Sequence, residues 1–397
     1  MVSVTEAADI IFSHLYKPTV ENVPLQESVN RVLGEKIIAD RDFPPFDRVS
    51  MDGIAIQFEA WKGGRKEFPV EFVQAAGSQA SSLKSPESCV EVMTGAVLPG
   101  KTDTVIRYED LEVKDGKALI LSDTIEPGQN VHRKGIDCKQ NDDLLEPGIL
   151  LSPAEVALLA SVGKSYVGVF KLPKAAIISS GDELVDVTES PQSHQIRRSN
   201  TYAIESAMQL LNWKGDQFHF SDNKDVLLKS LKTILESYEV LILSGGVSKG
   251  KFDYIPEVFE ELGVKKIFHH VNQRPGKPFW FGSSRDGKIV FALPGNPVST
   301  YMCFYRYIKP WILKSLGVAS TELTATLARN FSFNPILTYF LQVSVVSEQG
   351  RLMAYPEAGG GSGDFVNLKN ITGFLQLPPD RQTFQAGDTF PYFPFRN

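Results

Sequence analysis

The stretch LILSGGVSKGKFDY nearly matches a phosphate-binding loop. Gly245 and Gly250 are separated by four residues and Lys251 follows them, as in the strand, G-x-x-x-x-G-K and helix arrangement of such loops. The Ser or Thr that would hold magnesium is replaced by Phe252, and the next residue is Asp253. A carboxylate so close to bound phosphates would repel them unless a divalent cation bridged the two. The pattern therefore indicates glycine-cradled phosphates with a metal-binding carboxylate, or else only a tight turn between a strand and a helix.

Two further turns in the same part of the chain follow apolar runs directly. SSGDEL at 179–184 carries two carboxylates, one of them Glu183, and LPGNPVS at 293–299 opens a helical pattern. Because ligands of parallel sheets bind at the carboxyl ends of the strands, we expect all three turns on one rim. The amides at the helix start could bind an anion. Arg274 and Lys277 lie in the connecting segment and could add positive charge.

Strand and helix patterns alternate around these turns, which predicts an α/β domain with a mainly parallel sheet at 171–318. Expected strands are 174–184, 239–246 and 288–297, and expected helices are 200–215, 223–238, 253–263 and 298–313.

The segments before and after this α/β domain show other hydrophobic patterns. At the start of the chain, Ala8, Ile11 and Leu15 lie on one face of an expected helix for which Thr5 is a plausible cap. Short strand-like runs separated by Gly and Pro predict a β-rich domain. A second helix is expected at 152–163, with Ser152 as its cap and Pro153 at its first position. Four domains are predicted: an N-terminal helical and linker domain (1–40 with 141–170), an inserted β-rich domain (41–140), the α/β domain (171–318) and a C-terminal β-barrel-like domain (319–397).

The bulk composition bounds the class of protein. A chain of 397 residues with 42% hydrophobic and 22% charged residues indicates a globular protein of about two to four domains. The net charge of -6 gives no general attraction to nucleic acid or anionic membranes. Three widely spaced cysteines without a C-x-x-C indicate neither a disulfide framework nor a zinc site. With no signal-peptide pattern and no apolar run of spanning length, we expect a cytoplasmic protein without nucleic-acid or membrane partners.

Six motifs carry a resemblance that covers nearly the whole chain. PPFDRVSMDGIAI, MTGAVLPG, SSGDEL, SGGVSKGKFDY, RPGKPFWFG and LPGNPVST, in this order, resemble the MoeA family. These are molybdopterin molybdenumtransferases, related to the E domain of gephyrin. Each motif alone is modest, whereas six in order are specific.

The resemblance implies an enzyme of molybdenum cofactor biosynthesis. It would ligate molybdate to the dithiolene of molybdopterin, use adenylylated molybdopterin as substrate, and release AMP with the help of Mg²⁺. It also implies an elongated homodimer, with the active site between the α/β domain of one subunit and the β-rich domain of the other. A separate molybdopterin adenylyltransferase is then the expected source of the substrate, because no such domain is fused here.

The resemblance also assigns residues. Glu183, Asp222 and Asp253 are implied Mg²⁺ ligands, while Asp52 and Asp137 would orient groups from the facing subunit. The implied substrate-binding positions are Thr94, Gly95, Gly245, Gly246, Ser248, Gly250, Arg274, Lys277, Pro294, Gly295, Pro297 and Ser362.

Four positions depart from the family pattern. The family usually has Lys where this chain has His270 and Arg274. Arginine keeps the charge and can fork onto an anion, whereas histidine is mostly neutral near pH 7. Ile136 replaces a usual Glu, and Arg198 stands where an Asp is common. None of these changes removes a candidate metal carboxylate, but together they allow a diverged paralogue with altered substrate preference.

Simpler roles stay open for several of these residues. Asp222 precedes a helix and could be its N-cap, Asp52 could serve only an Asp-Gly turn, and Ser362 could belong to a flexible Gly-rich turn. Adjacent side chains of an extended run point to opposite faces, which disfavours a metal site at His269 and His270.

Two other functions compete with molybdenum insertion. A protein with the same α/β domain could hydrolyse a pyrophosphate-linked nucleotide without inserting a metal, but simpler modules of that kind lack the flanking domains. A non-catalytic scaffold is the other alternative, and the three carboxylates Glu183, Asp222 and Asp253 argue against it.

Overall fold

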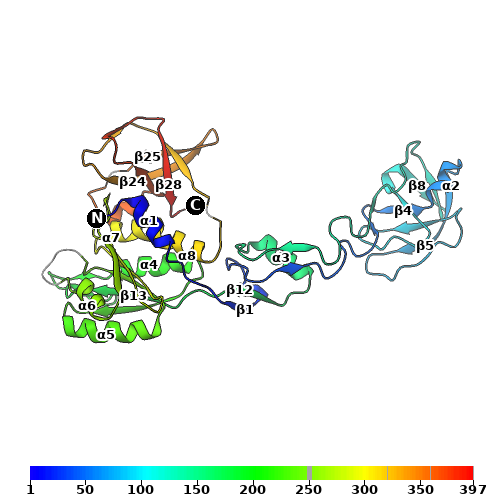
Figure 1. Cartoon of the computed structure of the whole chain (residues 1–397). Coiled ribbons are helices and arrows are strands. Elements are labelled where there is room, and N and C mark those ends of the chain that lie inside the picture. The colour runs from blue at the N-terminus through cyan, green and yellow to red at the C-terminus, as the bar shows by residue number, and fades with distance from the viewer. Residues whose placement is uncertain (248–252, 320, 358, 397) are drawn as a thin grey trace. The chain divides into compact units, whose positions relative to one another are not determined.

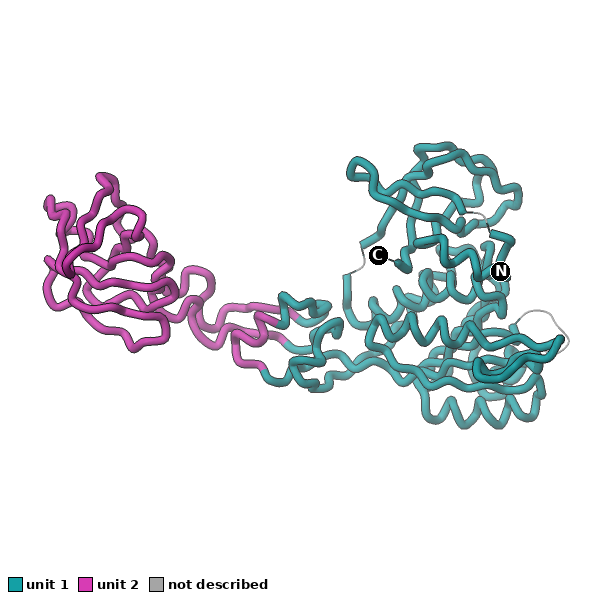
Figure 2. The backbone as a smooth tube through the Cα atoms, turned by 180° about the vertical axis from the view of Figure 1, so that it is seen from behind, with its two compact units in different colours: residues 1–35, 147–156, 165–397 teal, residues 36–146, 157–164 magenta. Residues whose placement is uncertain are grey.

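Figure 1 shows the computed structural model, which describes residues 1–247, 253–319, 321–357 and 359–396. These residues fall into two compact units. Unit 1 comprises residues 1–35, 147–156 and 165–397, and unit 2 comprises residues 36–146 and 157–164 (Figure 2). The chain therefore leaves unit 1 after its first segment and returns to it later. Helix α3 (Pro153–Ser161) belongs partly to each unit. It begins at the expected proline, and the Ser152 hydroxyl accepts a hydrogen bond from the Ala154 amide at 3.2 Å.

Helix α1 (Val4–Phe12) begins one residue earlier than its sequence pattern indicates. Ser3 caps it through a reciprocal capping box with Glu6, so the expectation of Thr5 as the cap is wrong. A capping box requires Glu or Gln three residues after the cap, and Ser3 meets that requirement. Ala8 and Ile11 are buried as predicted, whereas Leu15 lies beyond the helix and is exposed.

A six-stranded sheet forms the centre of unit 1, in the order β16-β13-β17-β21-β20-β18. The first four strands run parallel, and β20 runs antiparallel to both of its neighbours, β21 and β18, so the predicted mainly parallel sheet is present. The strands are β13 (Ala175–Ser180), β16 (Gly215–Phe220), β17 (Val240–Ser244), β18 (Lys265–His269), β20 (Trp280–Ser283) and β21 (Ile289–Leu293). The helices between and after them are α4 (Asn200–Gln209), α5 (Lys224–Ser237), α6 (Ile255–Glu261), α7 (Pro297–Cys303), the π-turn η3 (Phe304–Ile308) and α8 (Lys309–Ser315).

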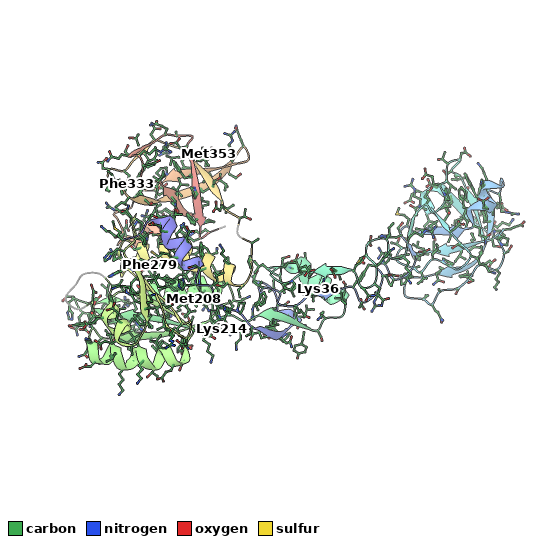
Figure 3. All side chains as sticks on the ribbon, viewed as in Figure 1. Lys36, Met208, Lys214, Phe279, Phe333 and Met353 are labelled. Carbon is green, nitrogen blue, oxygen red and sulfur yellow. The ribbon has the colours of Figure 1, made fainter. Side chains whose placement is uncertain are left out.

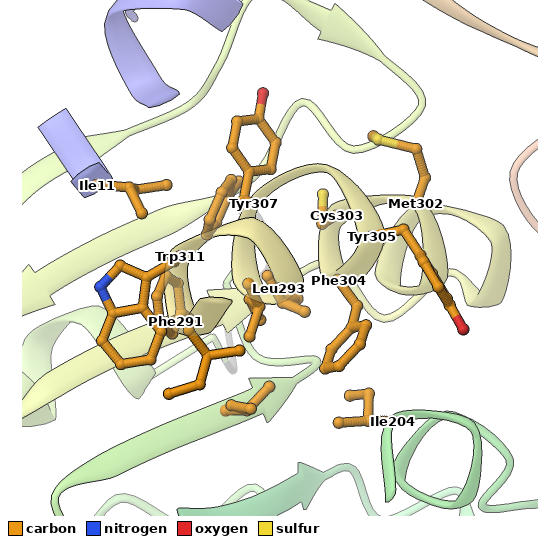
Figure 4. Close-up of a cluster of buried hydrophobic side chains, with 14 of the residues drawn as sticks. Ile11, Ile204, Phe291, Leu293, Met302, Cys303, Phe304, Tyr305, Tyr307 and Trp311 are labelled. Atoms are coloured by element: carbon orange, nitrogen blue, oxygen red, sulfur yellow. The ribbon is translucent and has the colours of Figure 1, made fainter. Parts of the chain in front are cut away.

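Both faces of this sheet are covered, which explains why its central strands are apolar at successive positions. Ile177 and Ile242 point into one core, and their neighbours Ile178 and Leu243 point into a second core. The first core gathers α1, α4, α7 and α8, and Figure 4 shows part of it around Phe291. The second core lies under α5 and α6. The sheet is thereby held rigidly from both sides, and its strand ends can position side chains precisely enough for binding.

The C-terminal part of unit 1 is a five-stranded closed barrel, in agreement with the barrel-like domain expected there. Strands β24, β25, β22, β28 and β26 pair in that order, and β26 pairs back with β24. Their bounds are β22 (Thr324–Leu327), β24 (Thr338–Glu348), β25 (Arg351–Pro356), β26 (Gly373–Leu377) and β28 (Thr389–Pro394), with the short pair β23 (Phe331–Ser332) and β27 (Thr383–Phe384) and the 3-10 turn η4 (Phe365–Lys369) beside them. One further strand, β19 (Gln273–Arg274), comes from the α/β part of the chain and pairs in parallel with β24.

Three short ladders complete the two units outside their main sheets. In unit 1, β1 (Val20–Pro24) pairs with β12 (Tyr166–Phe170), and β14 (Leu184–Val185) pairs with β15 (Ile196–Arg197). The 3-10 turn η1 (Leu25–Glu27) follows β1 directly. In unit 2, β2 (Ile37–Ile38) pairs with β11 (Asp143–Leu145).

Unit 2 is built around a sheet in the order β7-β4-β6-β5-β9-β8. Its strands are β4 (Gly53–Ile56), β5 (Glu67–Gln74), β6 (Cys89–Val92), β7 (Thr104–Arg107), β8 (Leu111–Lys114) and β9 (Lys117–Ile120), with α2 (Phe58–Lys62) and the 3-10 turn η2 (Tyr108–Asp110) between them. A small ladder of β3 (Arg48–Val49) and β10 (Val131–His132) adjoins this sheet. The β-rich character predicted for this part of the chain is therefore correct.

Candidate functional site

The three predicted turns lie on one rim of the unit 1 sheet. Strands β13, β17 and β21 are neighbours, with Ser179 opposite Ser244 and Ser244 opposite Leu293. The Gly245 amide donates to the Leu293 carbonyl at 3.1 Å, so the second and third turns touch directly. The expectation that these segments share a rim is confirmed.

A cavity of about 460 Å³ opens at this rim, and we call it the acidic cavity. All three predicted metal carboxylates line it: Glu183, Asp222 and Asp253. The other predicted residues along it are Gly245, Gly246, Pro294, Gly295 and Pro297. Ser180, Arg197, Arg198, Asn200, Thr201 and Ser244 also line it, and none of these was selected from the sequence as a site residue.

Asp222 is held by the rim and does not cap the following helix. The Ser180 hydroxyl donates to Asp222 Oδ1 at 2.5 Å. Helix α5 is capped by Asn223, whose side chain accepts from the amides of Asp225 and Val226. The N-cap role left open for Asp222 is therefore wrong, because the next residue fills it. One carboxylate oxygen of Asp222 is oriented by a buried hydroxyl, and the carboxylate faces the cavity.

Glu183 reaches the cavity because the residue before its turn is glycine. Gly181 has φ +146, and a Cβ on it would lie 2.6 Å from Glu183 Oε2. No larger residue would leave room for the Glu183 carboxylate in its present place. The backbone of Glu183 is fixed as well, since its carbonyl accepts from the Ile196 amide at 2.8 Å.

Asn200 ties the rim together, although sequence reasoning did not select it. Its Nδ2 donates to Ser244 Oγ at 2.8 Å and to the Gly295 carbonyl at 2.7 Å. The Thr300 hydroxyl donates to the Pro294 carbonyl at 2.5 Å. Along the chain, Ser244 is 44 residues and Gly295 is 95 residues away from Asn200. The only sequence signal was the position of Asn200 at the start of an expected helix.

The glycine-rich turn after β17 fits closely against its surroundings. Gly246 has φ +69, and a Cβ there would lie 2.5 Å from Ile255 Cγ1. The neighbouring Gly245 has φ +101, and its Cβ would lie 2.9 Å from the Ser180 carbonyl oxygen. The predicted residues Ser248 and Gly250 lie outside the described residues.

The two adjacent histidines do not point to opposite faces, so that expectation is wrong. Their rings stack with centroids 4.0 Å apart. His270 has φ +76, which breaks the alternation of an extended strand. His269 Nε2 lies 2.9 Å from the Val247 carbonyl oxygen and must donate to it, since a carbonyl only accepts. His269 thus holds the glycine-rich turn in place through the Val247 carbonyl.

A second cavity of about 510 Å³ adjoins the acidic one, and we call it the basic cavity. Arg274 and Lys277 line it, and among the described residues along its wall none is Asp or Glu. The Arg274 guanidinium lies 5.7 Å from the centre of the Phe333 ring, a residue of the barrel side that is labelled in Figure 3. This cavity therefore presents positive charge against an aromatic and glycine-rich wall.

The LPGNP turn separates the two cavities. Pro278, Pro294 and Asn296 line both of them. From the barrel side, Ser362 Oγ accepts from Asn296 Nδ2 at 2.8 Å, and the Ser362 carbonyl accepts from the Val298 amide at 3.1 Å. Ser362, a predicted site residue, thus lines the basic cavity and fastens the turn that the two cavities share.

The predicted residues of unit 2 form a small hydrogen-bonded group of their own. Asp52 Oδ1 accepts from the Thr94 amide at 2.6 Å and from the Thr94 hydroxyl at 2.7 Å. The amide bond, followed by the hydroxyl bond, lowers the pKa of the Asp52 carboxyl. Gly95, which has φ +86, donates its amide to the Val49 carbonyl. Asp52 is therefore more than a turn residue, because it holds the TGA segment in place.

Asp137 lies in the same neighbourhood of unit 2. His132 Nε2 is 3.0 Å from Asp137 Oδ1, and the other ring nitrogen of His132 is 3.1 Å from an Arg48 nitrogen. Because β3 (Arg48–Val49) contacts both β10 and the Thr94–Ala96 turn, Asp52 and Asp137 belong to one side of unit 2. Beside His132, Arg133 pairs with Asp47 at 2.7 Å and Lys134 pairs with Asp42 at 3.3 Å.

The acidic cavity could hold a metal ion only together with other donors. Over the described ranges, no group of three or more His, Cys, Asp or Glu side chains is close enough to enclose a metal ion. Three carboxylates nevertheless face one cavity, and carboxylate oxygens are the donors that Mg²⁺ prefers. Protein sites commonly hold Mg²⁺ by one or two carboxylates and complete its shell with substrate phosphates and water. The residues present fit that kind of site.

No helix within the described parts of the chain is long and apolar enough to cross a membrane.

Comparisons with known proteins agree on one family over the whole chain. Family models match residues 2–163 (MoeA N-terminal region, domains I and II), 176–314 (probable molybdopterin binding domain) and 324–395 (MoeA C-terminal region, domain IV). The chain is 40% identical to a molybdopterin molybdenumtransferase of Synechocystis sp. over 99% of this chain and 100% of that protein. It is 30% identical to the molybdopterin molybdenumtransferase of Staphylococcus aureus over 98% of this chain and 94% of that protein.

Solved structures give the same result. A molybdopterin biosynthesis MoeA protein of Pyrococcus horikoshii is 30% identical to this chain, with a TM-score of 0.84 and full coverage of both chains. A second MoeA structure from that organism is 25% identical, with a TM-score of 0.83 and full coverage of both chains.

Proposed function

This chain belongs to the MoeA family, and on that premise we propose that it is a molybdopterin molybdenumtransferase of molybdenum cofactor biosynthesis. Its substrates are molybdate and adenylylated molybdopterin. Water cleaves the phosphoanhydride bond between the molybdopterin phosphate and AMP, AMP leaves, and the two dithiolene thiols bind molybdenum in exchange for one molybdate oxygen, which leaves as water. The observation that carries this proposal is the pair of cavities of opposite charge that meet at the LPGNP turn.

The acidic cavity suits the end of the substrate that carries phosphate. Glu183, Asp222 and Asp253 would hold Mg²⁺ together with the phosphates, and the metal would offset the charge that develops as AMP leaves. Gly245 and Gly246 place backbone close to the ligand, since no side chain intervenes. Asn200 keeps the two glycine-containing turns at a fixed separation through its bonds to Ser244 and Gly295.

The basic cavity suits molybdate, which is a tetrahedral dianion. Its capture requires fixed donors and positive charge, and Arg274 and Lys277 supply both. Ser362 and Asn296 stabilise the wall between the two cavities. Binding molybdate and the nucleotide end on opposite sides of one turn would bring the metal to a substrate anchored beside it.

The residues of unit 2 fit the same proposal as parts of a second subunit. Asp52, Thr94, Gly95 and Asp137 form one polar side of that unit. In a homodimer, this side would complete the cavities of the partner and orient the substrate. We also propose the four-domain division given above and delivery of the substrate by a separate molybdopterin adenylyltransferase.

The test is AMP release from adenylylated molybdopterin with Mg²⁺, measured with and without molybdate for the wild type and Asp253→Ala. The proposal expects release that depends on molybdate and is lost in the variant. The Arg285→Gln variant changes one exposed residue of unit 1 and should behave as the wild type.

Each other result points to a different function. Release that ignores molybdate would identify a nucleotide hydrolase. Tight binding of adenylylated molybdopterin without any release would identify a binding protein or a paralogue with another substrate. Either result would overturn the proposal.

A further inference from the structure

Two buried polar atoms beside the acidic cavity have no hydrogen-bond partner within the described structure. They are Arg198 Nε and Thr201 Oγ1, and both residues line this cavity. Thr201 is fully buried, with 0% of its surface exposed. Buried polar groups are usually paired in folded proteins, so two orphans at one cavity wall indicate a place where a ligand supplies acceptors.

Both orphans lie at the start of helix α4, where the chain adds further donors. Ser199 is the N-cap residue, and its side chain makes no cap hydrogen bond to any described residue. The first amides of an α-helix have no partner within the helix, and its dipole favours negative charge there. This helix is ten residues long and its first turn lines the cavity.

Arg198 is held in a fixed orientation beside this helix start. Its amide donates to the Val185 carbonyl at 2.9 Å, and one terminal nitrogen forms an ion pair with Asp186. Asp186 is itself fixed by the amide and hydroxyl of Thr188 at 3.1 and 2.8 Å. Asp186 thus accepts from the terminal nitrogen Nη2, while Nε has no hydrogen-bond partner in the described structure. Only 14% of the Arg198 side-chain surface is exposed, so the charge is largely removed from water.

Arg198 is also the cation that the acidic cavity needs opposite its carboxylates. Two arginines line the cavity among its described residues, and Arg197 is exposed with its Nε donating to the Glu189 carbonyl. Burial and, secondly, the Arg198 charge lower the pKa of the nearby His219. A phosphate bound here would therefore meet a metal on the carboxylate side and a guanidinium on the α4 side.

We propose that Arg198, Thr201 and the first amides of α4 form a phosphate subsite of the acidic cavity, which binds the adenylyl phosphate of the nucleotide. The inference rests on the proposed function for the identity of the nucleotide. Guanidinium groups recognise phosphate through charge-assisted hydrogen bonds, and the Nε of Arg198 is a donor without a partner that can form one.

The experiment measures binding of AMP and of adenosine by calorimetry, at fixed Mg²⁺ and without molybdate. Arg198→Gln is expected to weaken AMP binding at least about tenfold, in keeping with the loss of a hydrogen bond to a charged group. Adenosine, which lacks the phosphate, should bind both proteins equally. Thr201→Val should weaken AMP binding by a smaller factor and at the same time raise the melting temperature, because it removes a buried hydroxyl without a partner.

Two variants separate binding from a merely structural role. Asp186→Asn removes the partner of the ion pair but leaves Arg198 in place, and it should retain most AMP affinity. Arg198→Lys should recover only part of the affinity, since lysine keeps the charge but has no donor at the position of Nε. The inference is overturned if Arg198→Gln binds AMP as the wild type does, if adenosine binding falls equally, or if Asp186→Asn reproduces the full loss.

Failure of this inference and failure of the proposed function give different results. Loss of AMP affinity in Arg198→Gln without any molybdate-dependent turnover by the wild type would support the subsite and reject the insertion reaction. Normal turnover with unchanged AMP affinity in Arg198→Gln would reject the subsite alone.

Discussion

The acidic and basic cavities share one wall but have opposite chemistry. Three carboxylates and two arginines line the first, whereas the second has an arginine and a lysine and, among its described residues, no carboxylate. The acidic cavity is built on the ends of parallel strands, and the basic cavity lies between the α/β part and the barrel. The difference supports the proposal that a phosphate with its metal and a free oxyanion bind separately, which would avoid competition between two anions for one set of cations.

The largest effect is expected from removing one carboxylate charge of the acidic cavity. Glu183→Gln keeps the size of the side chain but removes a charge that we propose binds Mg²⁺. We expect AMP release to fall by about 100- to 1,000-fold, on the order of the loss of one preorganised electrostatic group in an active site. The Mg²⁺ concentration for half-maximal rate should rise, while the apparent affinity for molybdate should stay the same. An unchanged rate and Mg²⁺ requirement would remove Glu183 from the metal site.

The matching change on the basic side is Lys277→Gln. A hydrogen bond to a charged group contributes about 1.5–3 kcal/mol, which corresponds to roughly 10- to 150-fold in affinity. The molybdate concentration for half-maximal AMP release should therefore rise by that factor, with little change in the Mg²⁺ requirement. If Lys277→Gln instead altered the Mg²⁺ requirement, the two cavities would not act separately.

A smaller effect is expected at the wall that the cavities share. Ser362→Ala removes the acceptor of the 2.8 Å bond from Asn296. We expect the free energy of unfolding to fall by about 1 kcal/mol and the molybdate requirement to rise by a few fold. Ser347→Ala, an exposed position on the barrel strand β24, serves as the control for both measurements. A shift in the Mg²⁺ requirement larger than that for molybdate would contradict the assignment of Ser362 to the basic side.

The smallest effect concerns pH and belongs to the acidic side. His219, whose Nδ1 lies 3.0 Å from Ser179 Oγ, has a pKa lowered first by burial and then by Arg198. The unfolded chain then binds a proton at this residue below about pH 6.5, where the folded protein does not. Stability from this residue is present above that pH and is lost as the pH falls toward the lowered folded-state pKa.

Urea unfolding measured between pH 8 and pH 5 checks this sign. The unfolding free energy should decrease less with falling pH in His219→Gln than in the wild type. An equal or steeper decrease in the variant would show that His219 is not the group responsible.

Local patterns predicted the elements and the rim, because strand and helix periodicities and turn glycines are short-range signals. The same reasoning erred where a neighbouring residue competes for one role. Ser3 caps α1 in place of Thr5, and Asn223 caps α5 in place of Asp222, since each has the better geometry for the first free amides.

Contacts between distant segments were beyond the reach of such patterns. Asn200 holds Ser244 and Gly295 together, and nothing near Asn200 in the sequence indicates these partners. Likewise, the stacking of His269 on His270 depends on a positive φ at a residue other than glycine, which periodicity does not predict. The functions assigned to the site residues stay predictions, although the structure brings most of those in unit 1 to two adjoining cavities.

Strand β19 links binding in the basic cavity to a backbone hydrogen bond that can be measured. Gln273 and Arg274 leave the α/β part of the chain to pair with the barrel strand β24, and the Thr338 amide donates to the Asn272 carbonyl at 3.1 Å. Arg274, whose guanidinium lines the basic cavity, therefore also belongs to the strand pairing that joins the α/β part to the barrel. Tightening of this ladder by a bound oxyanion would slow deuterium uptake at Thr338, so occupancy of the cavity could be followed at a single backbone position without any label on the ligand.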